Sequence, residues 1–201
     1  MGSKRYYMKY SIILLDYDPE NTKVEMTQKA IKSIADNSKN YDGELIVIKD
    51  VYGYSSAVNS GFKQVKGDYI VVLNNDVIIK DPKWLEKYSE IPNTITSRQL
   101  VSFYMNGDMF PDGCCWGIYK SDQEKVGLLD TIYDDGYGCD EIDYFYRAKE
   151  LGIEWRACDT NIEHLENQTF KEYFSKTKES KTERNVRLFK EKWDKKLTLK
   201  I

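Results

Sequence analysis

The chain has 201 residues, with 30 Lys or Arg against 33 Asp or Glu, and its net charge is −3. This length suits one domain with a single hydrophobic core, and a nearly balanced charge gives no sign of a nucleic-acid partner. The charge is uneven, because residues 166–201 carry 11 basic and 6 acidic side chains while the rest of the chain is acidic. No stretch approaches the roughly 18 apolar residues of a membrane-spanning helix, so we expect a cytoplasmic protein without a transmembrane segment.

The cysteines and the histidine do not form the pattern of a structural zinc site. Cys114, Cys115, Cys139 and Cys158 contain no C-x-x-C pair, and His164 is the only histidine. Structural zinc sites usually take several such ligands at short spacings. We therefore expect reduced thiols rather than a zinc cluster.

Strands and helices alternate in the first part of the chain. The apolar run 11–15 predicts a buried strand, and Thr22 with Glu25 predicts a capping box at the start of the helix that follows. Residues 44–48 predict the second strand, and residues 55–65 predict a second helix. This order is typical of a parallel sheet whose crossovers are helices.

A third strand, in the stretch 67–79, carries polar side chains where a buried strand has no use for them. Gly67 is expected to end the preceding helix, and Asn74, Asn75 and Asp76 interrupt the apolar run. A carboxylate buried without a partner costs several kcal/mol, so a divalent metal is the strongest candidate partner for Asp76. A polar turn after a core strand is the simpler alternative.

Acidic residues follow each of the three strands. Asp16 and Asp18 come after the first strand, Asp50 after the second and Asp76 within the third stretch. Ligands of parallel sheets bind beyond the carboxyl ends of the strands, so these side chains should converge at one edge. We expect an α/β fold with a mixed, mostly parallel sheet flanked by helices.

The second half of the chain predicts shorter elements with some antiparallel pairing. In chain order these are a helix from Asp81 and Pro82, strands at 94–97 and 100–105, a helix with Ser121 and Glu124 as its capping box and Gly127 at its end, a helix at 140–151 closed by Gly152, and a strand at 154–158.

Neither common phosphate-binding loop is present, since the chain has no G-x-x-x-x-G-K-[ST] motif and no G-x-G-x-x-G after its first strand. Two like charges about 4 Å apart repel by roughly 4 kcal/mol at an effective dielectric of about 20, so a diphosphate beside these carboxylates needs a counter-charge. Mg²⁺ or Mn²⁺ suits oxygen ligands and takes substrate phosphates in its remaining positions. We expect Asp76 to hold such an ion.

Several stretches of the first half carry a resemblance to a known family. Asn59-Ser60-Gly61, followed by residues 67–76, resembles the nucleotide-sugar half of family 2 glycosyltransferases of the GT-A fold, and residues 11–17 are similar to that family's first strand. The resemblance implies that Tyr17, Asp50 and Asn59 contact the nucleotide. Asp50 matches the acidic residue that reads the base in the family, commonly uracil.

The family's D-x-D motif appears here as Asn74-Asn75-Asp76, so an amide replaces the first carboxylate. The resemblance implies that Asp76 binds the metal directly, and that Asn74 and Asn75 contact the ribose or metal-bound water. His164 stands where the family often has a histidine near the metal or the diphosphate. A surface or core histidine is an equally weighted alternative for His164.

A second set of residues resembles the acceptor-side acidic motif of the same family. It comprises residues 125–130 and 137–143, followed by Arg147 and Gly152. The resemblance places Glu141 on the carboxylate that commonly acts as the base, with Asp140 as the second choice. Acidic residues at a helix N-terminus also stabilise the helix dipole without any catalysis. Asp143 and Arg147 are four residues apart, so an ordinary helical ion pair competes with a substrate role.

Two aromatic features have both a functional and a structural interpretation. Trp116 follows residues 112–115, where such enzymes line the donor sugar and acceptor, so it either stacks on a sugar or is buried in the core. The basic tail is expected to pack on the body as a helix, with docking on a membrane surface as the less favoured alternative. Its apolar residues at helical spacing are Val186, Phe189, Trp193 and Leu197.

The resulting domain prediction is a GT-A domain over residues 1–165, divided into a nucleotide-sugar half at 9–100 and an acceptor half at 101–165, with a helical tail at 166–201. We expect a metal-dependent, inverting glycosyltransferase that moves a sugar from a UDP-sugar such as UDP-glucose to a hydroxyl of a glycan or other acceptor. Further domains of a longer chain are a potential partner. The alternatives are a nucleotide-sugar-binding module without catalysis and a sugar nucleotidyltransferase.

Overall fold

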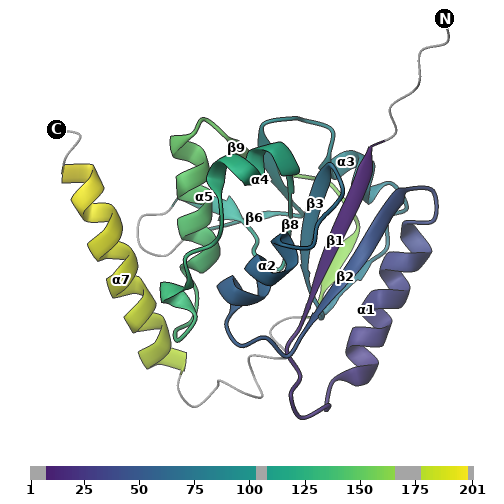
Figure 1. The fold of residues 1–201 in the computed structure, drawn as a ribbon, viewed down its shortest axis with the longest axis horizontal. Helices are drawn as coiled ribbons and strands as arrows, with labels where there is room; N and C mark the ends of the chain where they lie inside the picture. Colours follow the sequence, from purple (N-terminus) through teal and green to yellow (C-terminus); the bar gives the residue numbers. More distant parts are fainter. Residues whose placement is uncertain (1–7, 103–107, 166–177, 199–201) are drawn as a thin grey trace, which may run out of the picture.

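The computed structural model describes residues 8–102, 108–165 and 178–198 (Figure 1). A six-stranded sheet with the order β2-β1-β3-β8-β5-β9 forms its centre. Helices cover both faces of this sheet (Figure 1). This arrangement agrees with the predicted α/β class.

The first three strands of the sheet are parallel, as predicted. β1 (Lys9–Asp16) pairs with β2 (Asp42–Lys49) on one side and with β3 (Tyr69–Asn74) on the other. The crossovers are α1 (Val24–Asn37) and α2 (Tyr54–Phe62). The carboxyl ends of the three strands therefore meet at one edge.

The other half of the sheet is mixed. β8 (Cys115–Tyr119) runs antiparallel to both β3 and β5 (Thr94–Ser97), and β9 (Glu154–Ala157) is parallel to β5. The loop before β8 reaches the same edge as the end of β3, because antiparallel neighbours place opposite ends side by side.

Shorter elements complete the described chain. They are β4 (Val77–Ile79) paired with β10 (Ile162–His164), β6 (Leu100–Ser102) paired with β7 (Met109–Pro111), the helices α3 (Trp84–Tyr88), α4 (Lys120–Val126), α5 (Asp140–Glu150) and α7 (Lys178–Thr198), and the 3₁₀ helix η1 (Thr131–Tyr133).

Two apolar clusters pack on opposite faces of the sheet, because successive side chains of a strand point to opposite faces. In β1, Ile13 and Leu15 join the cluster that contains residues of α2 and α5. Ile12 and Leu14 join the other cluster, which contains residues of α1 and α3. The run 11–15 is thus a strand buried on both sides, as parallel strands between helical layers usually are.

Both predicted capping boxes are wrong. α1 begins at Val24, and the backbone N–H and hydroxyl of Thr22 donate to Oδ1 of Asp18 at 2.9 and 3.1 Å. A carboxylate accepts these hydrogen bonds more strongly than a hydroxyl, so the loop rather than Thr22 fixes the start of the helix. α4 begins at Lys120, which places Ser121 inside the helix instead of at its cap.

Gly67 does not end the preceding helix, as was predicted, and a glycine is needed there for a different reason. α2 ends at Phe62, five residues earlier, and Lys63 occupies its C-cap. A Cβ at Gly67 would lie 2.6 Å from the backbone nitrogen of Ser11, so glycine lets the chain pass close to β1. Likewise, α3 begins at Trp84 rather than at residues 81–82, and the part of the predicted strand 100–105 beyond Ser102 lies outside the described residues.

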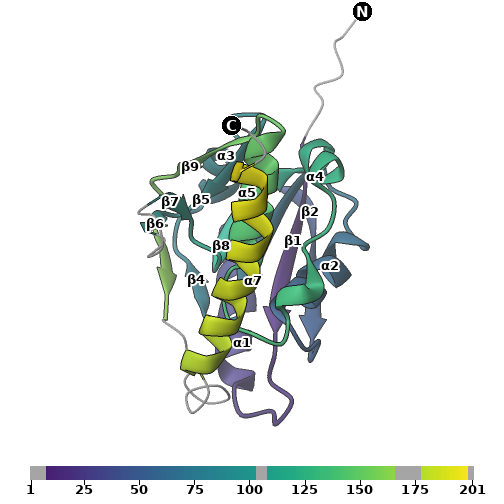
Figure 2. The same cartoon turned by 90° about the vertical axis from the view of Figure 1, so that its left-hand side faces the viewer.

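The tail helix α7 lies alongside α5, on the opposite side of the molecule from α1 (Figures 1 and 2). Phe189 and Trp193 are buried, with their rings 5.6 and 4.9 Å from that of Tyr146. Val186 packs against the same cluster, while the side chain of Leu197 lies outside the described residues. No helix in the described ranges is long and apolar enough to cross a membrane.

Candidate active site

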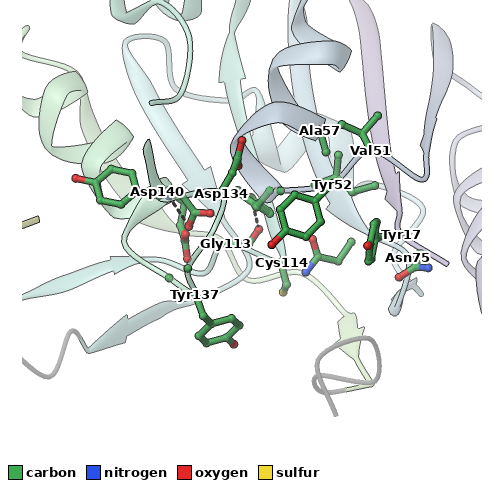
Figure 3. Close-up of a pocket in the computed structure, with 18 of the residues that line it drawn as sticks. Tyr17, Val51, Tyr52, Ala57, Asn75, Gly113, Cys114, Asp134, Tyr137 and Asp140 are labelled. Carbon is green, nitrogen blue, oxygen red and sulfur yellow. Dashed lines mark hydrogen bonds between the residues drawn. The ribbon is translucent and has the colours of Figure 1, made fainter. Parts of the chain in front are cut away.

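A cavity of about 330 Å³ opens at the edge where β1, β2 and β3 end (Figure 3). Three kinds of residue line it: tyrosines and loop residues after β1 and β2, the polar turn after β3, and an acidic group at the start of α5. Its wall includes Tyr17, Val51, Tyr52, Gly53, Tyr54, Ala57, Asn74, Asn75, Asp76, Asp112, Gly113, Cys114, Tyr133, Asp134, Gly136, Tyr137, Gly138, Asp140, Glu141 and His164.

The polar turn between β3 and β4 is held from beneath by a buried network. The amide nitrogen of Asn75 donates to Oδ1 of Asp16 at 2.8 Å and to the Thr27 hydroxyl at 3.1 Å, and that hydroxyl also donates to Asp16. The predicted convergence of acidic strand ends is therefore present. The hydrogen bond between Asp16 and Asn75 holds the turn in place. Asp76 lines the cavity and is almost fully buried.

His164 meets Asp76 across the cavity wall. Nε2 of His164 lies 3.2 Å from Oδ1 of Asp76, and the backbone N–H of Leu165 donates to the carbonyl of Asp76 at 2.9 Å. His164 is the last residue of β10, which pairs with β4 directly after the turn. A buried carboxylate and an imidazole this close form a donor set that fits a divalent cation.

His164 also belongs to a second set of donor atoms. One donor atom from each of Asp112, Cys114 and His164 falls within 4.8 Å of the others. A search for C-x-x-C pairs cannot find this cluster, because it contains one cysteine and its third member, His164, lies fifty residues after Cys114. Only the pairing of β8 with β3 and of β10 with β4 brings the three segments together.

The end of β2 and the end of β1 form an aromatic rim. The rings of Tyr17 and Tyr52 are 6.2 Å apart and nearly perpendicular. Asp50 is exposed next to them, and its Oδ1 accepts the backbone N–H of Asp18 at 3.2 Å. Sequence reasoning named Tyr17 and Asp50 but missed Tyr52, whose position two residues after Asp50 was the available signal.

The acidic pair at the start of α5 lies at the other end of the cavity (Figure 3). Asp140 is buried, whereas Glu141 is partly exposed. Burial raises the pKa of the Asp140 carboxyl well above its usual range, and the Glu141 carboxylate raises it further. Asp140 thus retains its proton to a higher pH than an ordinary aspartate, so the two neighbouring carboxyls have different character.

Asp143 faces away from the cavity and anchors the tail helix. Its side chain is fully buried and accepts from Arg147 at 3.0 Å, Lys192 at 2.8 Å and the Trp193 indole at 2.9 Å. These contacts make Asp143 a structural residue and confirm the helical ion pair with Arg147. They also link α5, which carries Glu141, to α7.

The loop that leads into α5 is held by a residue that sequence reasoning missed. The amide nitrogen of Asn185, in α7, donates to the carbonyls of Tyr133 at 2.9 Å and of Gly138 at 2.7 Å. Both carbonyls belong to the loop that lines the cavity. Gly138 and Cys139 have positive φ values of 72°, so the chain enters α5 through a turn that this anchor supports.

One predicted contact does not fit the geometry, and one pair of alternatives is decided by it. Asn59 is buried away from the cavity wall, and both ends of its amide bond the backbone of Leu129 at 2.9 and 2.8 Å. We therefore correct its assignment from nucleotide contact to a tie between α2 and the loop after α4. Trp116 is fully buried, and its indole donates to the Tyr54 hydroxyl at 3.0 Å, so it is a core residue rather than a sugar platform.

The mixed sheet flanked by helices, with a cavity at the carboxyl ends of its parallel strands, has the arrangement of the GT-A fold. Residues 3–108, just over half of the chain, match the model of glycosyl transferase family 2. The chain therefore belongs to glycosyltransferase family 2. Among curated proteins, none matches the sequence.

Solved structures with this fold are distant in sequence. A mutant of Drosophila β1,4-galactosyltransferase 7 with manganese, UDP-Gal and xylobiose has a TM-score of 0.63 at 15% identity, over 82% of this chain and 74% of that one. GalNAc-T7 with UDP, GalNAc and Mn²⁺ has a TM-score of 0.66 at 10% identity, over 80% and 44%. A mannosyltransferase from Pyrobaculum calidifontis with GDP-Man and Mn²⁺ has a TM-score of 0.56 at 12% identity, over 77% and 57%.

Proposed function

We propose that this glycosyltransferase is a metal-dependent, inverting enzyme that transfers a sugar from a UDP-sugar, with UDP-glucose favoured, to a hydroxyl of a glycan or other acceptor. The observation that carries the proposal is that one cavity joins the tyrosine rim, the Asp76–His164 pair and the Asp140–Glu141 pair. These groups match the three parts of such a reaction: a nucleoside, a diphosphate and an acceptor hydroxyl.

The nucleoside end is assigned to the rim. Tyr17 and Tyr52 offer two aromatic rings for a base, and Asp50 offers a carboxylate for the imide N–H of uracil. Asn74 lines the cavity beside them and is assigned to the ribose. The Drosophila enzyme is complexed with UDP-Gal, GalNAc-T7 with UDP and the Pyrobaculum enzyme with GDP-Man, so our choice of a uridine nucleotide follows from Asp50.

Asp76 and His164 would hold a divalent cation, Mn²⁺ or Mg²⁺. The solved structures with this fold that contain Mn²⁺ support this cation. When bound, the cation supplies positive charge that neutralises the leaving diphosphate. Asn75 acts from beneath, because its hydrogen bonds to Asp16 and Thr27 keep the turn that carries Asp76 in place.

Glu141 is assigned as the base that accepts the proton of the acceptor hydroxyl. It is partly exposed to the cavity, whereas Asp140 is buried and burial raises the pKa of its carboxyl well above the usual range. The exposed carboxyl is the one that an acceptor hydroxyl can reach. A base on the acceptor side, opposite the diphosphate, favours attack with inversion at the anomeric carbon.

The remaining expectations concern organisation and partners. We propose a GT-A domain over residues 1–165 with a packed tail at 166–201, a glycan or glycosylated acceptor, and further domains of a longer chain as a source of acceptor specificity. A cytoplasmic location, with the basic tail near a membrane surface, is part of the same proposal.

The decisive test measures UDP binding by calorimetry with and without Mn²⁺. Asp76→Ala should abolish the metal-dependent part of UDP binding, while Asp42→Asn, on the exposed side of β2, should leave it intact. The anomeric configuration of the product, read by NMR, tests inversion. UDP binding that does not respond to any divalent cation would overturn the proposal, and donor turnover at background in the wild type would indicate a binding module.

A further inference from the structure

The cavity contains a thiol at the position where oxygen and nitrogen donors gather. Donor atoms of Asp112, Cys114 and His164 lie within 4.8 Å of one another. In Figure 3, Cys114 lies between the tyrosine rim and the acidic end of the cavity. The set therefore combines a carboxylate, a sulfur and an imidazole nitrogen in one place.

Backbone hydrogen bonds fix the segments that carry these donors. The N–H of Asn74 donates to the carbonyl of Cys114 at 2.9 Å, and the N–H of Leu165 donates to the carbonyl of Asp76 at 2.9 Å. The N–H of Cys114 donates to Oδ1 of Asp112 at 3.1 Å. The loop before β8, the turn after β3 and the end of β10 are thus tied together, so the donors are held near one another before any cation arrives.

A fixed cation stands behind two of the donors. The guanidinium of Arg98 donates to Oδ2 of Asp112 at 2.6 Å and to the sulfur of Cys114 at 3.3 Å. Gln99 donates to the same carboxylate oxygen at 2.9 Å. Groups that orient metal ligands from outside the coordination sphere have this form.

We propose that Cys114 and Asp112 complete, with His164, a thiolate-containing cation site in the donor cavity, so that the enzyme binds Zn²⁺ or Co²⁺ through sulfur. The inference rests on the proposed function, since Asp76 contacts the same imidazole. Ligands about 2.0 to 2.3 Å from zinc stand roughly 3.3 to 3.8 Å apart in a tetrahedron, so the donors close by about 1 Å around the ion.

Sulfur changes which cation the site prefers. Thiolates favour zinc and other soft or borderline ions, whereas Mg²⁺ and Mn²⁺ favour oxygen.

The test is a Co²⁺ titration of the purified chain followed by absorbance. A sulfur-to-cobalt charge-transfer band is expected in the wild type, and Cys114→Ser should remove it. Cys158→Ser is the matched control, because Cys158 is as buried as Cys114 but lies outside the cavity wall, and this variant should keep the band. A wild type without the band, or a Cys114→Ser variant that keeps it, would overturn the inference.

A second measurement needs no variant. X-ray absorption of the zinc-loaded wild type should show one sulfur at about 2.3 Å in the coordination shell. A shell of oxygen and nitrogen alone contradicts the inference. Mn²⁺-dependent UDP binding without any metal–sulfur contact would sink the inference and leave the proposed function standing, whereas a sulfur-ligated cation without metal-dependent UDP binding would do the reverse.

Discussion

The two ends of the cavity are built in different ways. At the nucleotide end, Asp50 and Asp76 follow the parallel strands β2 and β3, which flank β1 in the sheet, so strand topology places their ends at one edge. At the acceptor end, Glu141 depends on a loop and a helix that α7 holds from more than forty residues away. Strand topology therefore fixes the nucleotide end, whereas the tail helix α7 fixes the acceptor end.

The two ends of the cavity also differ in the interactions that stabilise them. The turn after β3 is supported by hydrogen bonds from two uncharged side chains, those of Asn75 and Thr27, to a single carboxylate, Asp16. The start of α5 is supported by the fully buried Asp143 with two cationic partners, Arg147 and Lys192. A buried charge that loses its partners costs far more than a neutral hydrogen bond, so the acceptor end should be the more sensitive to changes remote from the cavity.

The largest expected effect comes from the base itself. Glu141→Gln should lower the rate of donor turnover by about 10²- to 10⁴-fold, because the amide cannot accept the proton. Affinity for UDP should stay unchanged, since Glu141 follows Asp140, which lies on the opposite side of the cavity from Tyr17 and Tyr52 (Figure 3). Steady-state kinetics and UDP calorimetry measure the two quantities.

Asp140→Asn is the matched control for that variant. Asp140 is buried and burial raises the pKa of its carboxyl well above the usual range, so an amide is a smaller change there and turnover should fall much less than in Glu141→Gln. A larger loss of turnover in Asp140→Asn than in Glu141→Gln would mean that Asp140, rather than Glu141, is the base.

Removing the Asp143 carboxylate should be the largest change in stability. Asp143→Ala leaves Lys192 and Arg147 without their buried partner, so the free energy of unfolding should fall by about 3–5 kcal/mol in urea denaturation. Asp36→Ala, which removes an exposed ion pair of α1, should leave the midpoint almost unchanged. Equal midpoints for the two variants would contradict the role of α7 as an anchor.

Asn185 tests the anchor without touching any charge. Asn185→Ala leaves the carbonyls of Tyr133 and Gly138 without their donor, so stability should fall by about 1–3 kcal/mol. Because Gly138 leads into α5, turnover should fall while the affinity for UDP stays as in the wild type. Kinetics and calorimetry separate these effects.

Asn37→Ala supplies the control for Asn185→Ala. Its amide also donates to two carbonyls, those of Ser33 and Ile79, both at 2.9 Å, but it ties α1 to β4 outside the acceptor end. A similar loss of stability with unchanged turnover is expected. If both variants lowered turnover alike, the effect of Asn185 would be a general consequence of lower stability.

The same contrast explains how far the sequence predicts this molecule. The order of strands and helices and the parallel start of the sheet follow from local patterns, which also indicated Asp76. The resemblance to the family implied Tyr17, Asp140 and Glu141 as site residues, and all four line one cavity. The function of Asn59 was misassigned because its partner, Leu129, lies seventy residues away.

Other roles were missed for the same reason. Residues 112–115 were expected to line the donor sugar and acceptor, but the grouping of Asp112 and Cys114 with His164 was not expected, and Asn185 was not named. These contacts form only when strands that are distant in sequence pair, or when α7 packs. Local patterns also misplace caps where a stronger acceptor is near, as Asp18 shows at the start of α1. Residue types alone carry no signal of such tertiary partners.

The smallest expected effect concerns Asp112, which joins the loop before β8 to Arg98. Burial alone would raise the pKa of its carboxyl, but the backbone N–H of Cys114 and the Arg98 guanidinium lower the pKa overall. A carboxyl with a lowered folded-state pKa stabilises the fold above its unfolded pKa, about 3.9, and loses that contribution as the pH falls further. Stability that depends on this pair should therefore decline below about pH 4.

Comparing the wild type with Asp112→Asn isolates this contribution. The difference in unfolding free energy between them should be largest at neutral pH and shrink as the pH falls through the acidic range, because protonation removes from the wild type the charge that the variant already lacks. Asp42→Asn, at an exposed position of β2, should follow the wild-type profile. A difference that stayed constant from neutral to acidic pH would mean that Asp112 stabilises the fold by its shape and hydrogen bonds alone. The charge of its carboxylate would then contribute nothing to stability.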